Sequence, residues 1–219
     1  MKRFPSQTTE FYSKKHNVIF YHITKCAMTT VRSTLECDRV PIKQITRQDQ
    51  TPKILCVVRD PVDRIISAFL FLRKLKRFHL QYQVRPTSPM FRKKFYELPL
   101  QRSFILMIDE IAKNGPFDTH IQRQVDFLGP TNTIQNEFAS SRSQDKVTDW
   151  VLLTNLDTYF MEHFGKKPQH RNTSSENSTN ALKTLVQEKP RIQNLINQVY
   201  REDFDLFGNV SAKSSPSLE

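Results

Sequence analysis

Two short apolar runs constrain the fold of this chain most strongly. Asn17–Ile23 is a β-prone run, and Ile54–Val58 (ILCVV) is a second one that is apolar at every position. A strand without polar residues is typical of a parallel sheet covered on both faces. About thirty residues separate the two runs, which is enough for a crossover between parallel strands. The pattern predicts a parallel strand–helix–strand unit and hence an α/β fold.

The remaining segments supply helices and loops for such a fold. Helices are expected over 29–35, 62–76, 101–114, 156–164, 181–187 and 190–200, and a further short strand over 150–153. Gly115 and Gly165 follow two of these helices and are suited to end them. Exposed or irregular segments are expected over 78–98, 138–146 and 170–180.

The length of 219 residues predicts one domain. We place it at 17–209, after a polar N-terminal segment over 1–16 and before a polar tail over 210–219. No apolar run approaches the roughly 18 residues that a membrane span needs. Residues 1–15 contain no apolar stretch of the kind found in signal peptides, so a targeting segment is not expected within this chain.

Charge and cysteine content narrow the class of partner. The formal net charge is +11, which predicts an anionic partner without choosing among nucleic acid, phosphates and acidic polymers. The three cysteines are an odd number and form no Cys-x-x-Cys pair, so neither a complete disulfide framework nor a zinc site is expected. Cys56 lies within the second apolar run and is interpreted as a buried small hydrophobe.

The segment His22–Thr30 lies between the first predicted strand and the helix after it. Phosphate loops occupy this place in α/β folds, because backbone N–H groups and a helix N-terminus face the anion there. Lys25 adds a positive charge, and Thr29 and Thr30 add hydroxyl groups. The Walker A pattern is absent and no Walker B acid follows, which disfavours nucleotide triphosphatases and kinase-like enzymes. The alternative is an ordinary strand–turn–helix with a surface lysine.

The segment Arg59–Phe69 follows the second apolar run. Arg59 leaves the carboxyl end of a predicted parallel strand, where open α/β sheets bind ligands. Asp60 and Pro61 suit the cap and first position of a helix, and Ser67 lies about two helical turns beyond Arg59. A guanidinium with a hydroxyl can grip a terminal phosphate. The alternative is that Arg59 and Arg64 pair with Asp60 and Asp63 on a helix surface.

Together, these two segments resemble the sulfotransferases that use 3′-phosphoadenosine 5′-phosphosulfate (PAPS), and most closely the Golgi carbohydrate sulfotransferases. Three later segments are also similar to that family: Asp118–Gln124 to its His-x-x-x-Gln stretch near the acceptor, His170–Ser174 to a His-x-Asn-x-Ser loop, and Tyr200–Gly208 to its closing Tyr-x-x-Asp-Phe-x-x-Phe-Gly. The resemblance implies a P-loop-like three-layer fold with a central parallel sheet flanked by helices.

The resemblance also implies roles for individual residues. Lys25 would contact the bridging or 5′-phosphate oxygens of PAPS, and Arg59 and Ser67 would hold its 3′-phosphate. His120 would be the base that accepts the proton of the acceptor hydroxyl, or alternatively would only orient the acceptor or the loop. No metal is expected. The rest of the phosphate loop would complete the donor site through Cys26, Ala27, Met28, Thr29 and Thr30.

An anionic or neutral glycan is the acceptor that the resemblance implies, and nucleic acid is not expected. The basic residues over 73–77 and 92–94 would meet a sulfated or uronate-bearing glycan, or else form a solvated basic face. The family implies the Golgi lumen, with the cytoplasm as the alternative. Glycosylation sequons that are compatible with a secretory lumen begin at Asn172, Asn177 and Asn209.

Two competing interpretations stay open. The loop has Thr24 where Pro is common in the family, and Ala27 and Met28 where Gly or Cys is common, so a family member that binds PAPS or glycan with little turnover is one alternative. A basic polyanion- or RNA-binding module is the other. It accounts for the charge but not for the Arg59-Asp60-Pro61 segment, and no RNP, KH or zinc-finger pattern supports it.

Overall fold

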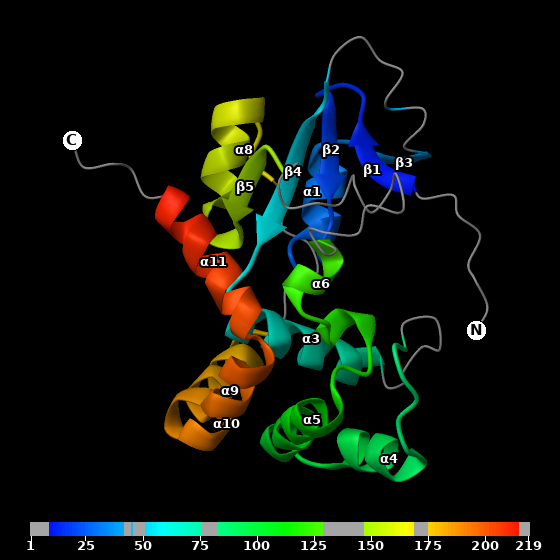
Figure 1. Cartoon of the computed structure of the whole chain (residues 1–219), viewed down its shortest axis with the longest axis vertical. Coiled ribbons are helices and arrows are strands. Elements are labelled where there is room, and N and C mark those ends of the chain that lie inside the picture. The colour runs from blue at the N-terminus through cyan, green and yellow to red at the C-terminus, as the bar shows by residue number, and fades with distance from the viewer. Residues whose placement is uncertain are drawn as a thin grey trace. The chain divides into compact units, whose positions relative to one another are not determined.

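The computed structural model describes residues 9–41, 45, 51–75, 83–128, 147–168 and 175–214. The chain forms two compact units (Figure 1). One, the sheet unit, comprises residues 1–58, 126–171 and 213–219, and the other, the helical unit, comprises residues 59–125 and 172–212. No helix in these described ranges combines the length and apolar character needed to cross a membrane.

The sheet unit is built on five strands in the order β3-β1-β2-β4-β5. Strands β2, β4 and β5 run parallel to one another, and β1 pairs antiparallel with both β2 and β3. The predicted parallel pairing of the two apolar runs is therefore confirmed, with Tyr21 opposite Cys56. The strand bounds are β1 Thr9–Ser13, β2 Val18–Tyr21, β3 Asp38–Pro41, β4 Lys53–Val58 and β5 Asp149–Leu152.

The apolar pattern of β4 accounts for its central position. Its last four residues are fully buried, as expected of a strand covered on both faces. Helices α1 (Met28–Thr34) and α8 (Leu156–Phe164) flank the sheet in this unit, with the short 3₁₀ turn η4 (Leu153–Asn155) between β5 and α8. The predicted α/β, P-loop-like architecture is confirmed, with a mixed sheet whose parallel strands form its centre.

Two strands, β1 and the edge strand β3, escape prediction. β1 lies within the stretch expected to be a polar N-terminal segment, yet Phe11 and Tyr12 are only 2% and 4% exposed. Polar residues surround this aromatic pair in the sequence, so the run is too short to read as a strand. β3 has no apolar pattern at all, because short charged edge strands need only one half-buried face.

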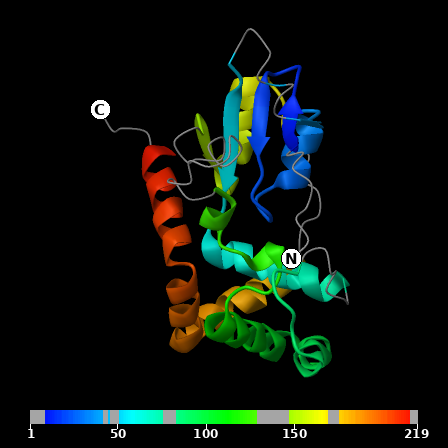
Figure 2. The ribbon, with the colours of Figure 1, turned by 45° about the vertical axis from the view of Figure 1, so that its right-hand side comes forward.

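Among its described residues, the helical unit contains seven further elements, which Figure 2 shows from a second side, and their buried core is rich in phenylalanine. Phe69 makes edge-to-face contacts with Phe95 and Phe104, at ring-centroid distances of 5.6 and 5.1 Å. Helix α6 (Gln124–Leu128) begins in this unit. The elements are α3 Pro61–Leu75, α4 Pro89–Glu97, α5 Leu100–Asn114, η2 Thr119–Ile121, α9 Glu176–Glu188, α10 Pro190–Val199 and α11 Arg201–Ser214.

Helix α4 corrects part of the prediction of an irregular segment over 78–98: residues 84–88 are irregular, 89–97 are helical, and 78–82 lie outside the described residues. Ser88 is the N-cap, with its hydroxyl accepting the N–H of Phe91 at 3.1 Å, and Pro89 takes the first helical position. Phe91 and Phe95 are buried one turn apart on the inner face. Pro89, which suggested a loop, begins the helix. The basic residues Lys93 and Lys94 lie on its exposed face.

The C-terminal part of the chain is also more helical than predicted. α9 begins at Glu176 rather than at residue 181, so Ser, Thr and Asn residues there form its first turns. α11 covers Arg201–Ser214, including residues expected to belong to the polar tail. The helix ends at Gly115 and Gly165 are confirmed, since both glycines have positive φ. The loops predicted at 138–146 and 170–174 lie outside the described residues.

The three cysteines are all free and buried. Cys56 is fully buried in β4, which confirms its interpretation as a small hydrophobe. Burial raises the pKa of Cys37 to about 12 and that of Cys56 well above its ordinary value, so both thiols are protonated at neutral pH.

We expect the packing of α4 to be measurable as stability. Phe95→Ala removes a fully buried ring and should lower the free energy of unfolding by about 3–5 kcal/mol. Met90→Ala, on the same helix but 66% exposed, should change it by no more than about 0.5 kcal/mol. Urea unfolding of both variants checks this, and equal, small effects would mean that α4 does not pack as described.

Candidate functional site

The loop after β2 has the backbone geometry of an anion-binding loop. Lys25 and Ala27 are both left-handed, with φ of 67° and 57°, and Cys26 donates its N–H to the carbonyl of Ile23 at 3.1 Å. Left-handed residues next to right-handed ones turn backbone N–H groups toward a shared concavity. Ala27 is also the residue from which α1 begins. The predicted strand–loop–helix is therefore present.

This geometry is strained, because neither left-handed residue is a glycine. A left-handed non-glycine residue is disfavoured by roughly 1–2 kcal/mol. Such strain gathers at ligand-binding loops, where the surrounding structure fixes the backbone. Ala27 therefore adopts the conformation that a glycine would take, although the sequence departs from the glycine-containing family loop.

The loop residues differ in how they are placed. Lys25 is half-buried and Thr29 is exposed, whereas Cys26 and Thr30 are buried, at 0% and 3% exposure. The Cys26 N–H is used within the loop, in the bond to Ile23. Ala27 and Met28 are half-buried. Lys25, Ala27, Met28 and Thr29 thus have solvent-accessible atoms for an anion, and Cys26 acts by shaping the loop.

The segment that follows β4 opens helix α3 as predicted. The Asp60 carboxylate accepts the N–H of Asp63 at 2.9 Å, and Pro61 is the first helical residue. Asp63 pairs with Lys183 at 2.7 Å. Arg64 is 1% exposed, so the alternative that placed Arg64 on a helix surface is wrong.

Arg59 and Ser67 are both half-buried residues of the helical unit. Arg59 precedes α3, so the helical spacing used to relate the two residues does not apply to it. Ser67 lies on α3, one turn before Phe71, whose ring contacts the His120 ring at a centroid distance of 4.6 Å. Ser67 and His120 therefore lie toward the same face of α3.

The backbone of Arg59 is held by the side chain of Gln124. The Arg59 N–H donates to Gln124 Oε1 at 3.0 Å, and Gln124 Nε2 donates to the Arg59 carbonyl at 2.8 Å. The side-chain amide of Gln124 thus hydrogen-bonds both the N–H and the C=O of Arg59, as a neighbouring strand would. Gln124, in the stretch that the resemblance places near the acceptor, thus contacts the Arg59 segment.

Two residues near the start of α11 hold the segment that carries Gln124. Asp203, which is fully buried, accepts the N–H groups of Gln124 at 2.7 Å and Val125 at 3.0 Å. The Tyr200 hydroxyl donates to the Ile121 carbonyl at 2.6 Å. The closing Tyr-x-x-Asp-Phe segment therefore anchors residues 121–125.

His120 is oriented by Asp118. Its ring Nδ1 lies 2.7 Å from Asp118 Oδ1, and its backbone N–H donates to the same oxygen at 2.9 Å. The Asp118 side chain is 1% exposed and that of His120 is 12% exposed. Because a carboxylate only accepts, Nδ1 carries a proton, and the lone pair of neutral His120 is on Nε2. Asp118 was missed by the sequence analysis, although it stands two residues before the predicted base.

Tyr96 lies close enough to Asp118 for their charges to interact. Burial, and to a smaller extent the Asp118 carboxylate, raise the pKa of Tyr96 to about 12, so its hydroxyl stays protonated at neutral pH. Asp118 Oδ2 is buried and has no hydrogen-bond partner among the described residues. The polar environment of His120 thus extends from η2 to α4.

The basic segments predicted to meet a glycan are partly structural. Arg73 donates to the carbonyls of Phe95 and Leu98 and so caps the end of α4, and Arg92 donates to the carbonyl of Thr87. Lys74, Lys93 and Lys94 are exposed. Residues 76 and 77 lie outside the described ranges. Only part of the predicted basic stretch is therefore available to a polyanion.

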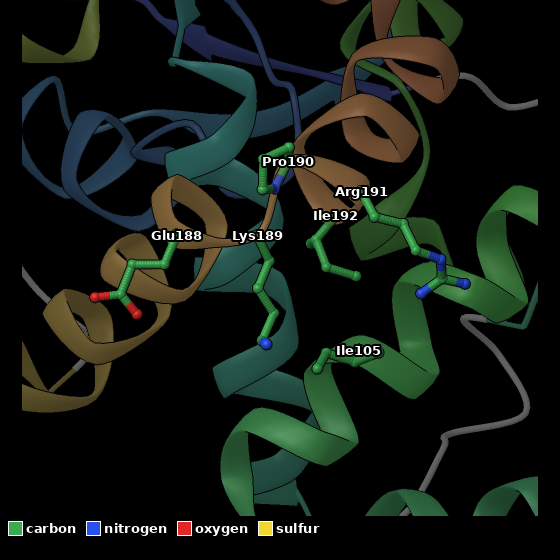
Figure 3. A pocket seen from close by; sticks show the side chains of 6 residues that line it. All are labelled: Ile105, Glu188, Lys189, Pro190, Arg191 and Ile192. Atoms are coloured by element: carbon green, nitrogen blue, oxygen red, sulfur yellow. The ribbon is translucent and has the colours of Figure 1, made fainter.

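A hollow of ≈ 410 Å³ lies where α9 meets α10, beside α5 (Figure 3). Its lining includes Ile105, Lys189 and Ile192, and at its rim Arg191 pairs with Asp109 at 2.7 Å. It contains none of the residues predicted to bind donor or acceptor. In the described part of the chain, no group of three or more His, Cys, Asp or Glu side chains could hold a metal ion.

Two of the three sequons can be placed. Asn177 lies in the first turn of α9 and Asn209 in α11, both exposed and both helical rather than in loops. Asn172 and His170 fall outside the described residues.

The strain at Ala27 gives a stability prediction. Ala27→Gly should raise the free energy of unfolding by about 1 kcal/mol, because glycine adopts positive φ without steric conflict. Ala112→Gly, exposed within α5, should lower it by about 1 kcal/mol. Opposite signs in urea unfolding are the expected result, and destabilisation by both changes would contradict the left-handed loop.

Comparison with known proteins identifies the family. A model of the sulfotransferase family matches residues 9–208, which include the phosphate loop, the Arg59 segment, His120 and the Tyr200–Gly208 segment. No curated protein and no solved structure matches the chain. Since the family match covers nearly the whole chain, the protein belongs to the sulfotransferase family.

Proposed function

We propose that this sulfotransferase transfers a sulfuryl group from PAPS to a hydroxyl group of a carbohydrate. Sulfotransferases of this family generally use PAPS as donor. The proposed acceptor is a glycan of the glycosaminoglycan kind, and the proposed compartment is the Golgi lumen. Acceptor and compartment both rest on the resemblance to the carbohydrate branch.

One observation carries the donor proposal: Arg59 follows directly on β4, and both its backbone groups are held by Gln124. The carboxyl ends of parallel strands are where open α/β sheets bind ligands. A guanidinium presented from a fixed backbone suits a phosphate dianion. We assign the 3′-phosphate to Arg59 and Ser67.

The 5′-phosphosulfate is assigned to the loop after β2. Lys25 would neutralise charge on the bridging and 5′-phosphate oxygens. The N–H groups of Ala27 and Met28 and the hydroxyls of Thr29 and Thr30 would hold the phosphate. Thr29 is the more accessible of the two threonines, since Thr30 is buried.

The reaction is a displacement at sulfur. The acceptor oxygen forms a bond to sulfur while the bond from sulfur to the 5′-phosphate oxygen breaks, and its electron pair leaves with 3′-phosphoadenosine 5′-phosphate (PAP). The acceptor proton moves to Nε2 of His120, whose ring Asp118 holds through Nδ1. The imidazolium that forms is stabilised by the buried Asp118 carboxylate. The chain thus supplies positioning, charge stabilisation and a base.

A second candidate function is favoured by the composition of the loop. Thr24, Ala27 and Met28 stand where other residues are common in the family. In this candidate function the chain binds PAPS at the same donor site but does not transfer the sulfuryl group. Turnover separates this candidate from the enzyme. A polyanion-binding module, which the charge of +11 also fits, would instead bind phosphates without regard to their position.

Ligand-induced stabilisation tests the donor site. PAP at a hundredfold excess over its dissociation constant should stabilise the protein by about 2.7 kcal/mol, which is visible as a raised melting temperature. AMP, which lacks the 3′-phosphate, should stabilise it less. Arg59→Ala should abolish the difference between PAP and AMP, and Lys25→Ala should weaken both.

Lys167→Ala is the matched control, because it removes the same charge from a side chain that is 75% exposed. It should leave both responses unchanged. An equal response to PAP, AMP and inorganic polyphosphate in the wild type would sink the donor assignment and favour the polyanion-binding module.

Kinetics test the base. His120→Ala should lower kcat roughly 100-fold or more, in the range of general-base catalysis, with PAP affinity unchanged. Asp118→Asn should lower kcat in the same direction, because the ring loses its orienting carboxylate. His163→Ala, an exposed histidine on α8, is the control and should retain full activity. If His120→Ala keeps wild-type kcat, His120 only orients the loop.

A further inference from the structure

The donor site has a built-in support that reaches from Arg59 to the C-terminal helix. Gln124 is fully buried, and its amide makes two hydrogen bonds to the backbone of Arg59. A residue that holds Gln124 in place therefore also holds the backbone that carries the Arg59 side chain.

Asp203 fixes Gln124. Both of its carboxylate oxygens are used, one by the N–H of Gln124 and the other by the N–H of Val125. Charge-assisted bonds of this kind are stronger than neutral ones, and here they are fully buried. A buried carboxylate with two N–H donors holds its partners tightly, because losing either bond leaves a buried polar group without its hydrogen bond.

Tyr200 adds a second anchor one turn earlier on the same part of the chain. Its ring is 1% exposed and its hydroxyl donates to the carbonyl of Ile121. Ile121 ends η2, the turn that carries His120. Tyr200 and Asp203 therefore hold both ends of the segment between the proposed base and the residue that clamps Arg59.

We propose that Gln124 and Asp203 are positioning residues for the donor 3′-phosphate, acting through the backbone of Arg59, and that Tyr200 supports them. This rests on the proposed function of Arg59. It assigns the His-x-x-x-Gln and Tyr-x-x-Asp-Phe segments to the donor side of the site. Donor affinity then depends on Asp203, in the first turn of α11, through Gln124 and the backbone of Arg59.

The test compares PAP with AMP, because the two ligands differ by the 3′-phosphate. Gln124→Met keeps side-chain length and removes both bonds to Arg59. It should raise the dissociation constant for PAP about tenfold or more, as expected for a misplaced binding group, and leave that for AMP unchanged. Asp203→Asn should do the same to a smaller extent. Asp205→Asn, an exposed residue of α11, is the control and should change neither constant.

A double-mutant cycle makes the claim specific. In an Arg59→Ala background, Gln124→Met should have no further effect on PAP affinity, because the group that it positions is gone. Isothermal titration calorimetry with PAP and AMP gives all the constants. If Gln124→Met is not obtained as folded protein, Asp203→Asn takes its place in the cycle.

The outcomes separate the two proposals. If the wild type does not prefer PAP to AMP, or Arg59→Ala retains that preference, the proposed donor function fails. If Arg59→Ala loses the preference while Gln124→Met and Asp203→Asn retain it, the positioning role is overturned and the donor site stands. If these two variants weaken PAP and AMP equally, the contacts serve only the fold, and the positioning role is again overturned.

Discussion

A buried carboxylate at Asp203 accepts two backbone N–H groups where α6 begins, and the geometry of the helical unit's candidate site follows from it. It holds Gln124, and Gln124 supplies the donor and the acceptor that the backbone of Arg59 requires. The same segment carries His120, whose ring is fixed by Asp118. One stretch of chain therefore carries His120 and holds the backbone of Arg59, and Asp203 of α11 holds that stretch in place.

The sheet unit carries the loop after β2. Its loop is proposed to turn N–H groups toward an anion, and the residues that usually permit this, glycines, are absent. Lys25 and Ala27 are nevertheless left-handed, so the neighbouring strand and helix impose the conformation against a local preference. The left-handed backbone at these two positions is thus present without a glycine. The loop therefore has a fixed shape and carries backbone strain at these two residues.

Much of this could be predicted from the sequence, because the signals were local. The apolar run in β4, the Asp60–Pro61 helix start and the glycine after α8 each act within a few residues. α4 was missed because its Pro and basic residues resemble a loop unless Ser88 is recognised as a cap. The partner of Gln124 could not be predicted, since Arg59 and Asp203 lie 65 and 79 residues away from it in the chain. Hydrogen bonds from a side chain to a distant backbone group produce no periodic pattern in the sequence.

The central claim is that this chain moves a sulfuryl group from PAPS to a carbohydrate hydroxyl. The most direct measurement is transfer of ³⁵S from labelled PAPS to desulfated glycosaminoglycan and to neutral glycan acceptors, with PAP release followed in parallel. We expect label in the polysaccharide, PAP formed in equal amount, and loss of both in His120→Ala. PAP binding without labelled polysaccharide for any of these acceptors would contradict it, and would mean that the donor site serves a protein that does not sulfate carbohydrates.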